Sequence, residues 1–194
     1  MKKESIVYIV LALVAGALLG VIVFNAKKNV SSNNAVPTQA EAPAPGPGAN
    51  FQQQISMLKG IVAKDPGNRN AWVQLGNDYF DSNQPMNAVE AYDKALKLNG
   101  NDPNVLTDQG VMYRRLGWFD KAVGNFEMAS KIDPNHRQSL YNLGLVYRDD
   151  LHDVPKAIAA WERFLAINPD GPGAAQVRAE LDALKNSPTM PTPE

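Results

Sequence analysis

Hydrophobic residues are spread unevenly along the chain and divide it into four stretches. Residues 6–24 form an apolar run of nineteen residues without a charge, whereas residues 29–50 are rich in Pro, Ala, Gly and Ser. From residue 51 to residue 186, apolar positions recur at the three- and four-residue spacing of amphipathic helices. Residues 187–194 are again rich in proline. The pattern predicts an apolar helix, a linker, an all-α domain and a tail.

The apolar run is long enough to cross a membrane. As a helix rising about 1.5 Å per residue it spans roughly 28 Å, close to the hydrocarbon thickness of about 30 Å. A cleaved signal peptide usually has a shorter apolar core and an A-x-A-like site, which residues 23–28 lack. The sequence therefore favours an uncleaved single-pass anchor over residues 1–28. A secreted protein with a cleaved signal is the alternative.

Lysine pairs at residues 2–3 and 27–28 flank this run. Basic residues ahead of a first anchor favour a cytoplasmic N-terminus, so we expect the rest of the chain outside the cytoplasm, in the periplasm if the membrane is an inner membrane. Within the run, Ala12, Gly16 and Gly20 form a small-xxx-small ridge. Such a ridge allows homodimerisation, but Gly and Ala are also simply common in membrane helices.

Residues 29–50 are predicted to be a disordered linker, because their proline-rich composition cannot bury a core. Treated as flexible coil, residues 25–50 reach about 25–30 Å. The same composition predicts a disordered tail over residues 187–194. We therefore expect the helical domain to be tethered near the membrane through residues 6–24 rather than to lie on it.

A period of 34 residues runs through the helical domain. The first half of each unit carries three columns of residues: Trp72, Leu106 and Leu140; Gly76, Gly110 and Gly144; Tyr79, Tyr113 and Tyr147. The second half carries a small residue and an aromatic one: Ala88, Ala122 and Ala157; Tyr92, Phe126 and Trp161. Gly and Ala at facing positions let two helices approach closely, and the aromatic residues fill the space between successive pairs. The third unit contains a one-residue insertion near His152.

These columns resemble the tetratricopeptide repeat, W-x2-L-G-x2-Y…A-x3-F…A…P. Gln109, where Leu is expected, and Phe164, where Ala is expected, depart from it. The resemblance implies helix pairs stacked in a right-handed superhelix with a concave groove. The units are one helix of a partial repeat in 51–66, full repeats 69–102, 103–136 and 137–171, and a solvated capping helix in 173–186. The expected helices cover 51–64, 69–82, 86–98, 103–116, 120–132, 137–149, 154–167 and 173–186.

The resemblance also implies that the first helix of each pair lines the groove and binds a client peptide. Carried over position by position, the lining comprises Asn70, Val73, Gln74, Asn77, Phe80, Asp81, Asn104, Thr107, Asp108, Val111, Arg114, Arg115, Gln138, Tyr141, Asn142, Leu145, Arg148 and Asp149. We single out Asn77, Thr107, Val111, Arg114, Arg115, Tyr141, Asn142, Leu145 and Arg148 as the peptide-binding set. Only Asn142 fits the two-carboxylate clamp of chaperone-binding repeats.

Arg114 and Arg148 lie one repeat apart, so we expect their side chains to project side by side. A pair of guanidinium groups suits a carboxylate or an acidic segment of a client. The alternative is that both arginines pair with Asp108 and Asp149 on a solvated surface. The residues do not decide between the two.

Composition narrows the function further. With 19 Lys+Arg against 20 Asp+Glu, the chain has no electrostatic footprint for nucleic acid. The absence of Cys excludes disulfides, thiolate metal sites and C-x-x-C-H haem attachment. The two histidines, His136 and His152, are not spaced for a catalytic triad or a metal site, and we expect both to be solvated loop residues. The sequence predicts no enzyme, metal or cofactor.

Two classes of function remain. The first is a membrane-anchored module that binds a protein or peptide client, similar to repeat domains of bacterial envelope assembly factors, including those of cytochrome c maturation. The second is a structural scaffold whose repeats associate with copies of themselves. The identity of the client does not follow from the residues.

Overall fold

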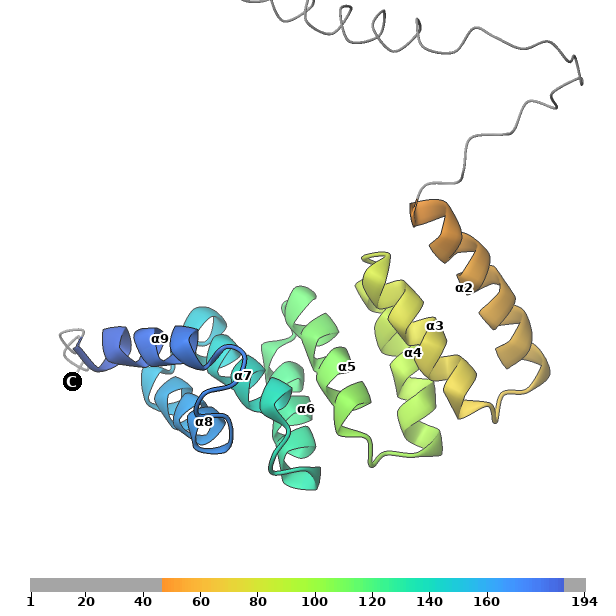
Figure 1. Cartoon of the computed structure of the whole chain (residues 1–194). Coiled ribbons are helices and arrows are strands. Elements are labelled where there is room, and N and C mark those ends of the chain that lie inside the picture. The colour runs from red at the N-terminus through yellow and green to blue at the C-terminus, as the bar shows by residue number, and fades with distance from the viewer. Residues whose placement is uncertain (1–46, 187–194) are drawn as a thin grey trace, which may run out of the picture. The chain divides into compact units, whose positions relative to one another are not determined.

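A computed structural model describes residues 47–186 of the chain, which form helices joined by short loops (Figure 1). The predicted anchor with its small-residue ridge, the linker before residue 47 and the tail lie outside these described residues. Within residues 47–186 there is no strand, and no helix combines the length and apolar character needed to cross a membrane. The helices are α2 (Pro47–Lys64), α3 (Arg69–Asp81), α4 (Pro85–Leu98), α5 (Pro103–Arg115), α6 (Phe119–Ile132), α7 (Arg137–Leu145), the π-helical turn η1 (Val146–Asp150), α8 (Val154–Ile167) and α9 (Ala174–Asn186).

The helix boundaries follow local sequence signals. Asn68, Asp102 and His136, spaced by 34 residues, cap α3, α5 and α7, and each side chain accepts a hydrogen bond from a backbone N–H of the first helical turn. Those N–H groups have no partner inside the helix, so the caps fix where each helix begins. The column of caps therefore sets the register of the three first helices.

Several observed helix ends differ by one residue from those expected, and two further differences have a structural reason. Helix α2 begins at Pro47, inside the stretch assigned to the linker. Proline fits the first turn of a helix, because a backbone N–H at that position would have no acceptor within the helix and its absence costs nothing. The helix expected over 137–149 continues to Asp150 through η1, where the Leu151 N–H donates to the Val146 carbonyl five residues earlier (3.0 Å). This wider turn takes up the one-residue insertion of the third unit.

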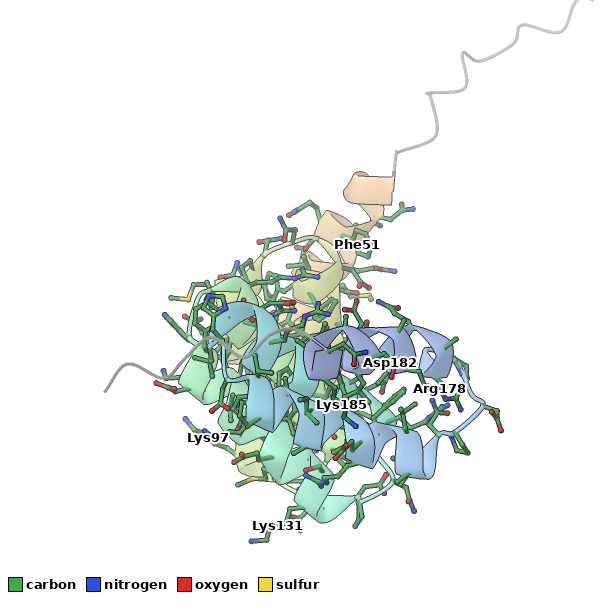
Figure 2. All side chains as sticks on the ribbon, turned by 90° about the vertical axis from the view of Figure 1, so that its left-hand side faces the viewer. Phe51, Lys97, Lys131, Arg178, Asp182 and Lys185 are labelled. Carbon is green, nitrogen blue, oxygen red and sulfur yellow. The ribbon has the colours of Figure 1, made fainter. Side chains whose placement is uncertain are left out.

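The helix pairs α3–α4, α5–α6 and α7–α8 stack in chain order, with α2 packed on α3 and α9 packed on α8 (Figure 1). Helix α5 also contacts α3 and α7, so the first helices of the pairs form a continuous inner row. This row is the wall that the sequence assigned to the groove. Seen from the C-terminal end, α9 covers the last pair and carries Arg178, Asp182 and Lys185 on its exposed side (Figure 2). A polar outer face of this kind suits a terminal helix of a repeat array.

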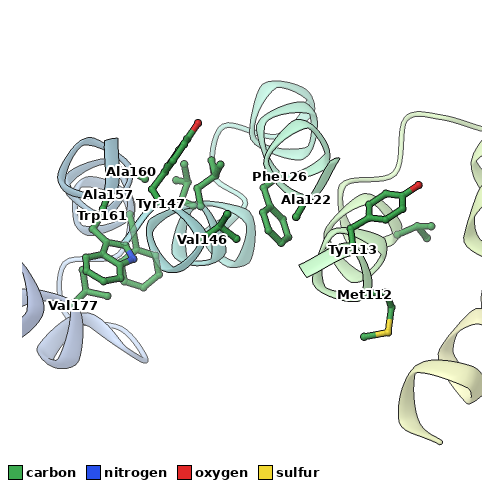
Figure 3. Packing of buried hydrophobic residues seen from close by; sticks show 14 of the residues in the cluster. Met112, Tyr113, Ala122, Phe126, Val146, Tyr147, Ala157, Ala160, Trp161 and Val177 are labelled. Atoms are coloured by element: carbon green, nitrogen blue, oxygen red, sulfur yellow. The ribbon is translucent and has the colours of Figure 1, made fainter. Parts of the chain in front are cut away.

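The glycine column allows the two helices of each pair to meet. A Cβ atom at Gly110 would lie 2.5 Å from the ring of Phe126, and one at Gly144 would overlap the indole of Trp161. Tyr92 covers Gly76 in the same way. Phe126 and Trp161 are at most 1% exposed and pack among the small residues of their own helices (Figure 3). A side chain at any of these three glycines would displace a buried ring, so glycine lets the two helices of each pair pack closely.

Both departures from the repeat pattern have a structural reason. Buried Gln109 donates to the Asp93 carboxylate (2.7 Å) and the Val89 carbonyl (3.3 Å), and it accepts a hydrogen bond from the Asn125 side chain (2.8 Å). A polar network therefore joins α4, α5 and α6 where leucine would pack. Phe164 is 3% exposed and lies beside the Tyr141 ring, with 5.9 Å between ring centroids.

Candidate peptide-binding site

A cavity of about 510 Å³ opens at the amino-terminal ends of α7 and α9. It combines residues from the start of α5, the loop before α7, the first two turns of α7, one residue of α8 and the beginning of α9. They are Asn104, Asp133, Asn135, His136, Arg137, Gln138, Tyr141, Asn142, Phe164, Pro172, Gly173 and Gln176. Four of them, Asn104, Gln138, Tyr141 and Asn142, were expected to line the groove.

The wall of the cavity combines polar side chains with apolar surface in similar proportion and contains one acidic and one basic side chain. Five carboxamide side chains line it, from Asn104, Asn135, Gln138, Asn142 and Gln176. The two neighbouring rings of the wall, from α7 and α8, make its apolar part. Carboxamides both donate and accept hydrogen bonds, so this wall can pair with the backbone of an extended peptide.

His136 is buried, contrary to the expectation of a solvated loop residue. Its Nδ1 accepts a hydrogen bond from the Ser139 N–H (3.3 Å) and lies 3.4 Å from the Thr107 hydroxyl. The ring proton therefore lies on Nε2, which donates to Asn104 Oδ1 (3.0 Å). The signal that sequence reasoning missed is the register, because the positions 34 and 68 residues earlier, Asp102 and Asn68, are also helix caps.

Arg114 and Arg148 lie side by side, as expected, but both are engaged within the protein. Arg114 pairs with Asp149 (3.1 Å) and Asp150, and Arg148 pairs with Asp149 (2.5 Å) and Glu180 (2.6 Å). The pairing with Asp149 agrees with the alternative in which both arginines pair with acidic residues of the protein itself. Their other partners are Asp150 and Glu180, in place of the expected Asp108. These arginines tie α5 to η1 and η1 to α9, and they do not line the cavity.

The remaining predicted groove residues lie apart from the cavity. Thr107 is 3% exposed, so it does not present its hydroxyl to a ligand. Val111 and Leu145 pack against the core. Asn77 accepts a hydrogen bond from the Tyr92 hydroxyl (2.9 Å), and Arg115 lies over the Phe80 ring. The cavity thus contains Tyr141 and Asn142 of the predicted set.

Family models of the tetratricopeptide repeat match residues 70–102 and residues 107–172, which together make up half of the chain. The spacing of the matched segments agrees with the 34-residue period and with the stacked helix pairs. The chain belongs to the tetratricopeptide repeat family. Among the described residues, no group of three or more His, Asp or Glu side chains is placed to hold a metal ion.

Relatives within this family are larger proteins. The chain is 30% identical over 129 residues to the protein O-mannosyl-transferase TMTC1 of Mus musculus, covering 64% of this chain and 14% of that protein. Over 52 residues it is 40% identical to the formate-dependent nitrite reductase complex bifunctional subunit NrfFG of Haemophilus influenzae, covering 27% of this chain and 14% of that protein. The chain therefore spans a small part of these relatives.

Solved tetratricopeptide repeat structures have the same fold. The crystal structure of MamA superposes with a TM-score of 0.66 at 24% identity, covering 70% of this chain and 77% of that chain. The first repeat domain of Spaghetti (RPAP3), solved with the HSP90 peptide SRMEEVD, has a TM-score of 0.55 at 20% identity, covering 61% and 94%. At these identities the likeness shows the fold, and this fold is compatible with a protein–protein interaction module.

Replacing the two linking arginines tests their structural role. In Arg114→Ala/Arg148→Ala, Asp149, Asp150 and Glu180 lose their partners, so we expect a loss of about 1–2 kcal/mol of stability, above the roughly 0–1 kcal/mol of a lone surface pair. Lys156→Ala, which removes an exposed pair with Asp153, is the control and should change stability little. Urea unfolding measures both. Equal stability of the double variant and the control would contradict the linking role.

Asp108 gives a pH-dependent prediction. Burial, together with the charges of Asp102 and Asp81, raises the pKa of Asp108 to about 6. Because the folded value lies above that of an unfolded chain, the folded protein gains stability from this group as the pH falls through 6. Asp108→Asn should therefore stabilise the protein by about 1–2 kcal/mol at pH 7.5, and the gain should vanish by pH 4. Thermal melts at both values test this, with the exposed Asp182→Asn as control; a gain that is independent of pH would contradict it.

Proposed function

We propose that this protein is a membrane-tethered adaptor that binds an extended segment of a client protein in the cavity at the starts of α7 and α9. The proposal rests on the composition of the cavity wall, which contains five carboxamide side chains and the neighbouring rings of Tyr141 and Phe164. Peptide backbones need both donors and acceptors, and an apolar side chain needs an apolar surface. The wall provides both.

The solved relative with a bound peptide supports a peptide as ligand. The peptide bound in that structure, SRMEEVD, is acidic, and a two-carboxylate clamp would bind its carboxylates. Here only Asn142 matches that clamp, and Asn142 donates its own amide to the Gln138 carbonyl (2.8 Å). A different class of client segment is therefore proposed for this chain.

The tether is the second part of the proposal. The uncharged run over residues 6–24 and the linker after it favour a single-pass anchor with the repeats outside the cytoplasm. The role proposed for the tethered repeats is the assembly of envelope complexes, such as those of cytochrome c maturation, and the similarity over 52 residues to a subunit of the formate-dependent nitrite reductase complex is compatible with work beside a protein complex. The repeats would then hold a client close to the membrane.

Orientation has its own test. A reporter that is active only after export, fused after residue 190, should be active, because the short basic segment ahead of the anchor favours a cytoplasmic N-terminus. The same reporter fused to a chain lacking residues 1–28 should be silent. A silent full-length fusion, or a mature N-terminus near residue 27, would contradict the anchored topology.

Site-specific photo-crosslinking tests the adaptor function in the native membrane. A photoreactive residue at Asn135, on the rim of the cavity, should capture a client protein that mass spectrometry then identifies. The same group at the exposed Met128 of α6 is the control and should not capture that protein. Equal capture from both positions, or capture of only a second copy of this chain, would favour the self-associating scaffold.

A further inference from the structure

The carboxamides of the cavity retain much of their hydrogen-bonding capacity. Those of Asn135, Gln138 and Gln176 make no hydrogen bond to another described residue. Asn104 uses its carbonyl oxygen toward His136, and Asn142 uses its amide toward the Gln138 backbone, so each keeps the other half of its group. The cavity therefore offers solvent-exposed donors and acceptors that are not engaged within the described part of the protein, in similar numbers.

The wall carries one charged residue of each sign. Arg137, the single Lys or Arg among the described lining residues, donates to the Asn168 side chain (3.2 Å). Asp133, the single carboxylate among them, accepts from the Asn135 backbone N–H (2.9 Å). His136 is held neutral, because its Nδ1 accepts the Ser139 N–H. These two charges cancel, so a ligand segment that carries charges of a single sign gains no net electrostatic attraction from the wall.

The apolar part of the wall is formed chiefly by the Tyr141 ring, because the neighbouring Phe164 is only 3% exposed. Tyr141 is half-buried, and its ring lies at 53° to the ring of Phe164. Pro172 and Gly173 border the same space from the start of α9. An aliphatic or aromatic side chain seated on this ring pair would leave the flanking backbone next to the carboxamides.

We infer that the cavity selects an extended peptide segment without charged side chains, held by paired hydrogen bonds between its backbone amides and the carboxamides, with one apolar residue on Tyr141–Phe164. This inference rests on the proposed function and specifies the chemistry of the client. It also replaces the acidic ligand that Arg114 and Arg148 were considered to bind, since those arginines are paired with Asp149, Asp150 and Glu180.

A random dodecapeptide library displayed on phage, panned on the full-length chain in detergent, tests the selectivity. Wild type should enrich peptides depleted in Asp, Glu, Lys and Arg and carrying one apolar residue. Gln138→Ala/Gln176→Ala should lose this enrichment, and a synthetic copy of the best peptide should bind it at least tenfold more weakly. The matched control Gln52→Ala/Gln53→Ala, two exposed glutamines of α2, should behave as wild type.

A charge swap sharpens the result. Gln138→Lys places a cation in the wall, so it should shift the selected peptides toward acidic sequences. If wild type itself selects acidic peptides in a manner that depends on Gln138 and Gln176, the peptide site stands and the selectivity is overturned. If no selection depends on these residues, both the proposed function and this inference are overturned.

Discussion

Gly144→Ala is expected to destabilise the protein by about 1–3 kcal/mol or more, because overpacking a filled core displaces its neighbours. The added methyl would overlap the Trp161 indole, which is 1% exposed and donates from Nε1 to the Tyr141 carbonyl (3.1 Å). The ring has no free space into which it can move, so either this hydrogen bond or the contact between the two helices must change. Gly110→Leu, against Phe126, should have the same sign.

The chain supplies a matched control for this prediction. Gly124 lies in α6, and apart from its chain neighbours and the adjacent backbone of its own helix no described atom lies within 4 Å of where its Cβ would be. Gly124→Ala should therefore stabilise the protein by about 0.5–1 kcal/mol through helix propensity alone. Thermal unfolding followed by circular dichroism measures both variants. If Gly144→Ala also raised the melting temperature, the glycine would serve flexibility and not close packing.

Acid is expected to destabilise the repeats through His136. Burial lowers the pKa of His136, and this effect outweighs the charges of Asp133 and Asp102, which act in the opposite direction. An unfolded chain therefore takes up the proton at a higher pH than the folded protein does. Stability from the neutral ring is fully present above about pH 6.5 and is lost as the pH falls below it, because protonation of Nδ1 ends the cap on α7.

Substitutions of His136 separate its role as the cap of α7 from the effect of its protonation on stability. His136→Asn uses the residue that caps α3 at Asn68, so it should keep much of the stability at pH 7 and remove this part of the loss between pH 7 and pH 5. His136→Ala should cost about 1–2 kcal/mol at pH 7, since it also removes the cap. Urea unfolding across this pH range compares the three proteins. An unchanged acid dependence in His136→Asn would assign the effect to another group.

Most of the fold could be predicted because the residues that contact one another recur at fixed spacings along the repeats. Gly110 and Phe126 meet in the structure as their columns imply, and the same holds for Gly76 with Tyr92. The π-helical turn could not be predicted, because an insertion is equally compatible with a longer loop. The polar network at Gln109 was visible only as a departure from the pattern, since the partners of this α5 residue belong to two other helices, α4 and α6.

The candidate site was predicted less completely. Position-by-position transfer gave Tyr141 and Asn142, but it could not give Gln176 of the capping helix or Pro172 of the loop before it, since both lie outside the repeat period. The transfer considered only Asp108 and Asp149 as partners of the two arginines, and it could not give Glu180 of the capping helix, which pairs with Arg148. A cavity closed by a non-repeating element depends on how that element packs, and periodicity carries no information about it.

Hydrogen exchange of the full-length protein, with and without the client captured at Asn135, tests the binding site most directly. We expect slower exchange of the backbone amides of residues 133–142 and 172–178 when the client is bound, because the cavity is lined by the starts of α7 and α9. The residues that line the cavity of about 310 Å³ between α2, α3 and α4 serve as an internal reference. Their backbone amides should exchange at the same rate with and without the client. Protection confined to α2–α4, with none at α7 or α9, would contradict the proposed site.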